Sequence, residues 1–69
     1  MTTIAMPLVL HADDPAYGLE RYSVPQAAAY LLVSPSRIYA DVSAGRLAHR
    51  KDGNRRLRFS QADLDAWRS

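Results

Sequence analysis

The sequence predicts a small α+β domain that is mainly helical: two helices joined by a short turn, a two-stranded hairpin and a short C-terminal helix. Two patterns support this prediction. Helix-start signals recur at three serines, and apolar residues alternate with arginines beside a turn-rich loop. The chain has 69 residues and no cysteine, so packing alone has to stabilise its single core. That length leaves no room for a catalytic pocket between two lobes, so we do not expect an enzyme.

Residues 1–21 are expected to form an N-terminal arm that precedes the folded domain of residues 22–69. They show neither a sustained helical period nor clean alternation, and they are interrupted at Pro7, Pro15 and Gly18. We expect at most one extended run and one helical turn, which Asp14 and Pro15 would start. The first 20 residues carry three acids and no Lys or Arg, a net charge of −3.

The first helix is expected at residues 24–32. Ser23 is a favourable N-cap, and Gln26 three residues later completes a capping-box pattern. The alanines that follow favour helix and let a second helix approach closely. The apolar side of this helix consists of Val24, Ala27, Ala28, Tyr30, Leu31 and Leu32.

The second helix is expected from residue 35 to residue 44. Ser34 is a good N-cap, Pro35 fits the first helical position, and Gly45 is a natural C-cap. Ile38 and Val42, with part of Tyr39, form the buried stripe. The outward face then carries Ser36, Arg37, Ala40 and Asp41. Helices joined by so short a turn cross steeply, as in a helix-turn-helix, and the second is the reading helix.

A β-hairpin is expected next, with strands at residues 47–50 and 56–59 and a turn-rich loop at residues 51–54. In the second strand, Leu57 and Phe59 alternate with arginines. A period of two places both apolar side chains on the core face and both arginines outside, which predicts a basic wing.

The last helix is expected at residues 61–68. Ser60 and Asp63 repeat the capping pattern, and Leu64 and Trp67 share one side of the helix. The chain is therefore expected to end on a short helix that packs against the rest of the domain.

Positive charge is concentrated in residues 46–58, which carry six Lys and Arg residues against one acid, a net charge of +5. Such a stripe suits the phosphates of nucleic acid. A lone basic run is equally well explained as a solvated surface without a partner. The predicted elements around this basic stretch are therefore needed to choose between a nucleic-acid-binding surface and a solvated surface.

Five segments stand in a characteristic order: YSVPQAA at 22–28, VSPSRIY at 33–39, GRL at 45–47, RRLRF at 55–59 and ADLDAW at 62–67. Together they resemble the excisionase-like, MerR-related winged-helix family of small DNA-binding proteins. The resemblance implies a winged helix-turn-helix whose second helix enters the major groove of double-stranded DNA. It also implies that the wing follows the backbone or enters the adjacent minor groove, and that phage members direct integrases toward excision.

The sequence departs from this family at three positions. Leu32 stands where the interhelical turn usually has Gly, and a left-handed conformation costs a non-glycine residue about 1 to 2 kcal/mol. Ala40 and Asp41 stand where basic or amide side chains are usual on the reading helix. Asp41 is either an acceptor for a cytosine amino group or a solvated residue repelled by phosphate. Affinity is then expected to come largely from arginines.

Candidate DNA contacts lie in the reading helix and in the wing. Ser34 is first a cap, Ser36 lies where a helix N-terminus favours phosphate, and Arg37 is the best candidate for reading a base. In the wing, Arg55 and Arg56 flank the loop tip and are placed to reach into a narrow minor groove. The remaining candidates are Ala40 and Asp41 on the helix and Arg50, Lys51, Asn54 and Arg58 in the wing, with Arg46 as a phosphate neighbour.

Other classes of function find little support. His11, Asp13 and Asp14 lack a fourth metal ligand at regular spacing, and the sequence offers no catalytic constellation, cofactor motif or small-molecule site. The apolar run at residues 4–10 is far shorter than the roughly 20 residues of a membrane span. We therefore expect a cytoplasmic protein without metal or cofactor.

The leading hypothesis is an excisionase that binds and bends attachment-site DNA and directs a separate integrase. A small MerR-like transcription regulator is the alternative, and an antitoxin or antirepressor that docks through residues 6–10 is the third hypothesis. The chain ends at Ser69, two residues after Trp67, so we expect it to lack the long helix through which MerR-type regulators dimerise. We therefore expect monomers that associate side by side on direct repeats in DNA.

Overall fold

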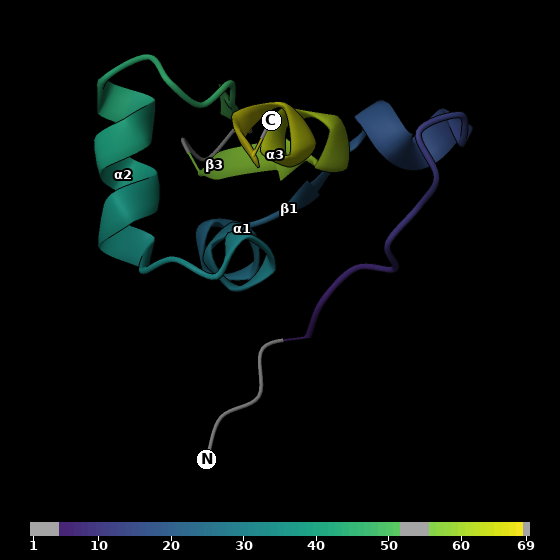
Figure 1. Cartoon of the computed structure of the whole chain (residues 1–69), viewed down its shortest axis with the longest axis horizontal. Helices are drawn as coiled ribbons and strands as arrows, with labels where there is room; N and C mark the ends of the chain where they lie inside the picture. Colours follow the sequence, from purple (N-terminus) through teal and green to yellow (C-terminus); the bar gives the residue numbers. More distant parts are fainter. Residues whose placement is uncertain (1–4, 52–55, 69) are drawn as a thin grey trace.

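Three helices pack around a three-stranded antiparallel sheet in the computed structural model, which describes residues 5–51 and 56–68 (Figure 1). The strand order in the sheet is β1-β3-β2. The elements along the chain are the 3₁₀ turn η1 (Pro15–Gly18), β1 (Glu20–Tyr22), α1 (Val24–Leu31), α2 (Pro35–Ser43), β2 (Arg50–Lys51), β3 (Leu57–Ser60) and α3 (Gln61–Arg68). The predicted α+β fold, mainly helical with a wing, is confirmed.

The helix starts follow the predicted caps. In α1, Gln26 Oε1 accepts from the backbone N–H of Ser23 at 2.9 Å, which closes the capping box. The hydroxyl of Ser34 accepts from the N–H of Arg37 at the start of α2. In α3, Ser60 and Asp63 cap each other, since each side chain accepts from the other's backbone N–H. All three predicted helices are confirmed within a residue or two.

The chain leaves the C-terminal ends of α1 and α2 through residues of different type. Leu32 follows α1 in the left-handed conformation, with φ 59° and ψ 41°, although a residue with a Cβ rarely adopts it. Its side chain is 86% exposed. Gly45 follows the cap of α2 with φ 74°, where glycine avoids that cost. The interhelical turn therefore carries strain at Leu32 that a glycine would not have.

The sheet differs from the predicted hairpin in two ways. The first strand of the wing was expected at residues 47–50, but β2 begins at Arg50 and includes Lys51, which was expected in the loop. Leu47 is instead buried in the core, with 2% of its surface exposed. β2 therefore begins only after this buried residue, at Arg50. A third strand, β1, was not predicted, and it pairs with β3 opposite the wing. The predicted loop residues 52–54 lie outside the described residues.

The core lies where the helices meet the sheet. Ile38 of α2, Phe59 of β3 and Leu64 of α3 are fully buried together, and Tyr22 of β1 joins them. Apolar positions of every helix thus contribute to one core with the strands, at about 1.5 to 3 kcal/mol per fully buried large side chain. This packing fixes α2 and the wing relative to each other.

The segment before β1 lies along α3. Leu10 and Gln61 exchange two hydrogen bonds, from the backbone N–H to Oε1 at 2.8 Å and from Nε2 to the carbonyl at 2.7 Å. Asp14 caps η1 as expected, and the hydroxyl of Tyr17 donates to Asp65. The predicted helical turn is therefore confirmed. None of the helices in the described residues is long and apolar enough to cross a membrane.

Candidate nucleic-acid interface

The outward face of α2 is formed by small side chains. Ser36 and Ala40 are exposed as predicted, and Ser43 joins them in the last turn. Tyr39 and Arg37 lie at the two edges of this face and are also exposed. The helix therefore presents a narrow surface with few long side chains, which suits close approach to another surface.

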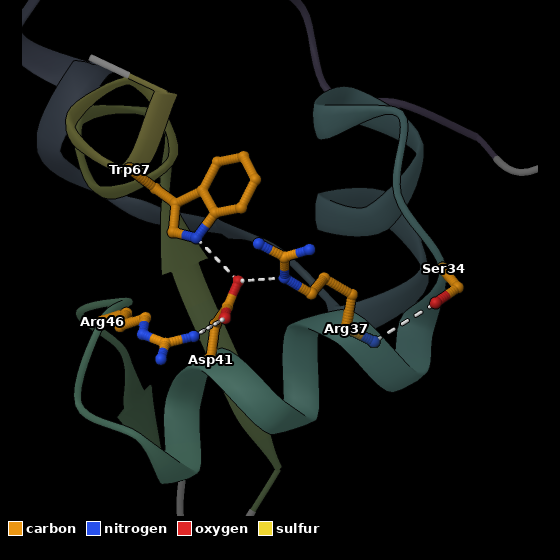
Figure 2. A network of polar contacts seen from close by, with 5 residues as sticks. All are labelled: Ser34, Arg37, Asp41, Arg46 and Trp67. Carbon is orange, nitrogen blue, oxygen red and sulfur yellow. Dashed lines mark hydrogen bonds and ion pairs between the residues drawn. The ribbon is translucent and has the colours of Figure 1, made fainter.

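Asp41 was predicted to face outward, and that prediction is wrong. Its side chain is fully buried, because it lies three residues after Ile38 on the face that α3 covers. Trp67 Nε1 donates to Asp41 Oδ2 at 2.7 Å, and Arg37 Nε donates to the same oxygen at 3.1 Å (Figure 2). Arg46 Nη1 lies 3.5 Å from the other oxygen, Oδ1. The carboxylate is thus committed to protein partners and does not reach a base.

The Asp41 carboxyl is ionised in this setting. Burial favours the neutral form, but the hydrogen bonds from Trp67 and Arg37 and the charges of Arg37 and Arg46 outweigh it. The pKa of Asp41 therefore lies below its ordinary value. Its negative charge offsets part of the positive charge that the two arginines would otherwise offer to DNA.

Arg37 is drawn to one edge of α2 rather than standing outward. Figure 2 shows its guanidinium beside the hydrogen bond that joins Trp67 to Asp41, and its Cζ lies 5.7 Å from the centroid of the Trp67 rings. The side chain is nevertheless 54% exposed. Because Nε is bound to Asp41, the edge formed by the two Nη groups is the one that suits a bidentate contact.

The wing supplies the other predicted residues. Arg50, Lys51 and Arg56 are exposed, while Arg58 is half-buried. Arg50 pairs with Arg58 across β2 and β3, so both side chains belong to the same rung of the wing. Asn54 and Arg55 lie outside the described residues. The wing thus carries cationic side chains on both of its strands.

An open groove joins α2 to the wing. It has a volume of about 360 Å³ and runs between the start of α1, α2 and β3; its lining residues are Ser23, Val24, Pro25, Tyr39, Arg56, Leu57 and Arg58. Part of Tyr39 was expected in the buried stripe of the helix, and the side chain lines this groove while remaining 55% exposed. The exposed edge of α2, Arg56 just before β3 and Arg58 in β3 therefore form one continuous surface.

Two participants were missed by sequence reasoning. Trp67 was assigned only to packing, yet its indole binds Asp41, and the spacing of Asp41 from Ile38 was the signal that this acid faces inward. Glu20 was assigned to the arm, yet its Oε1 lies 2.8 Å from Arg50 Nε. Nothing in the sequence indicated that β1 brings this acid to the wing. Within the described residues, no group of acids and histidines is arranged to hold a metal ion.

Comparison with known proteins supports the arrangement at the level of the family. Searches of curated proteins and of solved structures gave no significant match. The model of a family described as a helix-turn-helix domain matches residues 21–69, well over half of the chain. The matched residues include α1, α2, both strands of the wing and α3. The chain therefore belongs to the helix-turn-helix domain family, a family of DNA-binding domains, and has the small α+β winged form of that fold.

Proposed function

We propose that the chain binds double-stranded DNA sequence-specifically as an architectural factor of recombination, an excisionase that directs a separate integrase. The observation that carries DNA binding is the continuous surface from α2 through the groove at Tyr39 to Arg56 and Arg58 of the wing. In this proposal α2 lies in the major groove, and the wing holds the backbone or enters the adjacent minor groove. The chain itself catalyses no reaction.

The small outward side chains of α2 support insertion into the major groove. Ser36, Ala40 and Ser43 add little bulk, so the helix backbone is able to approach the bases closely. The first turn adds the Nη edge of Arg37, which suits the O6 and N7 acceptors of guanine. Phosphate contacts come from the wing, whose cations position the protein without reading sequence.

One copy of the domain reads few base pairs. Its α2 has nine residues, and one long side chain at its outward edge is suited to bidentate contact. At about 1 to 3 kcal/mol per discriminated base pair, one such helix does not select a single site in a genome. We therefore propose that several copies bind side by side on direct repeats and that the row of wings curves the duplex. This mode of binding favours the architectural role.

The first experiment measures binding to a random-sequence duplex over a range of salt concentrations. The cations of α2 and the wing are sufficient for about six phosphates, and at about 0.9 per phosphate the slope of log K against log salt is expected near −5. A slope shallower than about −2 would contradict the electrostatic interface.

The second experiment separates excision from transcription control. An integrase encoded in the same genome is incubated with attachment-site DNA, with and without the protein, and the excised product is quantified. The proposal predicts that excision rises with the protein and that integration does not. Unchanged excision together with repression of a neighbouring promoter would instead support a small transcription regulator.

A further inference from the structure

The side chain of Glu20 reaches past the central strand of the sheet and binds an arginine of the wing. It lies in β1, Arg50 lies in β2, and the central strand β3 separates them. The register shifts between Glu20 and Tyr22, so that Glu20 pairs with Ser60 while Tyr22 pairs with Phe59 in the core. Its carboxylate then reaches Arg50, with Oε1 2.8 Å from Nε. An acid from outside the wing thus holds one of the wing's exposed cations.

This ion pair lies in a shallow groove that otherwise has the character of a phosphate site. The groove has a volume of about 320 Å³, and its lining consists of Glu20, Arg50, Lys51 and Arg58. Three of these four side chains are cationic. A carboxylate and a phosphate oxygen make the same kind of charge-assisted hydrogen bond to a guanidinium. Glu20 therefore takes up a donor of Arg50 that a DNA phosphate would use.

We infer that Glu20 limits the affinity of the wing for DNA, because it competes with backbone phosphates for Arg50. This inference rests on the proposed DNA binding. On a random duplex, α2 finds no preferred register, and the Arg50–Glu20 pair persists at the cost of one phosphate contact. On the preferred site, α2 fixes the register, and a phosphate held next to the wing replaces Glu20. The preferred site therefore has to break the Arg50–Glu20 pair, while the random duplex loses only the weaker phosphate contact, so Glu20 weakens binding to the preferred site at least as much as binding to random DNA.

The size of the effect follows from the exposure of the pair. The side chain of Arg50 is 76% exposed and that of Glu20 is 33% exposed, so solvent and salt screen their attraction. Pairs of this kind change an equilibrium by about two- to fivefold.

The test compares Glu20→Gln with a matched control, Asp13→Asn, in the full chain. Both changes remove one negative charge, and Gln keeps the length of the side chain in β1. Asp13 is exposed in the turn before η1, which lies at the end of the molecule opposite α2 (Figure 1). Binding to a random duplex and to a site selected from a random library is measured by fluorescence anisotropy at several salt concentrations.

We expect E20Q to bind the selected site about two- to fivefold more tightly than the wild type, and to tighten binding to the random duplex by no more than this factor. On the random duplex its salt dependence is expected to be steeper by about 0.9, because Arg50 takes up one more phosphate. D13N is expected to change both affinities by a smaller and equal factor. In an Arg50→Ala background, E20Q is expected to behave like D13N.

Three results would overturn the inference: equal effects of E20Q and D13N, weaker binding by E20Q, or a gain that persists without Arg50. A melting curve followed by circular dichroism checks that each variant is folded. If neither the wild type nor any variant binds DNA, the proposed function itself fails and this inference fails with it. If the wild type binds and E20Q does not differ from D13N, only the role of Glu20 fails.

Discussion

The indole of Trp67 donates a hydrogen bond to the buried carboxylate of Asp41 at 2.7 Å and so ties the last helix of the chain to α2. Arg37 binds the same oxygen from one side and stacks near the indole. The orientation of α2 is therefore fixed by a polar network as well as by the apolar core around Ile38. Several properties of the proposed interface depend on this network.

The contribution of Asp41 to stability is expected to depend on pH. Because its pKa in the folded protein lies below the ordinary value of 3.8, Asp41 stabilises the fold at pH values above 3.8. That stabilisation is lost as the pH falls through the lower pKa of the folded state. In urea denaturation, Asp41→Asn should therefore unfold more easily than the wild type at pH 7, with a smaller difference at pH 3. A difference that is the same at both pH values would contradict an ionised Asp41.

The strain at Leu32 predicts a stabilising substitution. A left-handed conformation costs a residue with a Cβ about 1 to 2 kcal/mol, while the flexibility of glycine in the unfolded chain costs about 0.5 to 1 kcal/mol. Because the Leu32 side chain is 86% exposed, Leu32→Gly loses little buried area. We expect L32G to raise the free energy of unfolding by up to about 1 kcal/mol, measured by denaturant titration.

Alanine substitutions at two glycines serve as controls for that prediction. Gly45→Ala introduces the same strain at φ 74°, with no neighbouring atom in the way, but it also removes the flexibility of glycine from the unfolded chain, so it should lower the free energy of unfolding by up to about 1 kcal/mol. Gly18 has an ordinary φ and equally open surroundings, so Gly18→Ala should have little effect. A destabilised L32G would show that the turn gains something from the leucine side chain.

Arg37→Lys separates base reading from the support that Arg37 gives to Asp41. Lysine keeps a positive charge near the carboxylate, but it lacks the planar edge of two Nη groups. We expect R37K to cost about 1 to 3 kcal/mol of binding free energy on the selected site and little on a random duplex. Arg56→Ala, in the wing, should weaken both by about the same factor. An equal loss on both duplexes for R37K would mean that Arg37 contacts only the backbone.

The helices were predictable because their signals are local. Ser23, Ser34 and Ser60 each cap the helix that follows within three residues, and no distant contact is needed to recognise them. The inward direction of Asp41 was not predicted, because an acid on a short helix is usually solvated, and Trp67 covers it from 26 residues away. The structure thus corrects the face of α2 and leaves its place in the fold unchanged.

The wing was predicted only in outline for a similar reason. Alternation at Leu57 and Phe59 identifies β3, but β1 has three residues and too short a pattern to be recognised. Its pairing with β3 is a contact between segments far apart in the sequence. The ion pair between Glu20 and Arg50 follows from that pairing, so it was also beyond the reach of local patterns.

The most direct measurement of the architectural role is a titration of DNA that carries one, two or three direct repeats of the selected site. Binding is followed by electrophoretic mobility, and curvature is measured by circular permutation of the fragment. We predict cooperative binding to two and three repeats, a bend that grows with each copy, and loss of both after insertion of five base pairs, about half a helical turn. Independent binding that ignores the insertion and leaves the duplex straight would contradict the account.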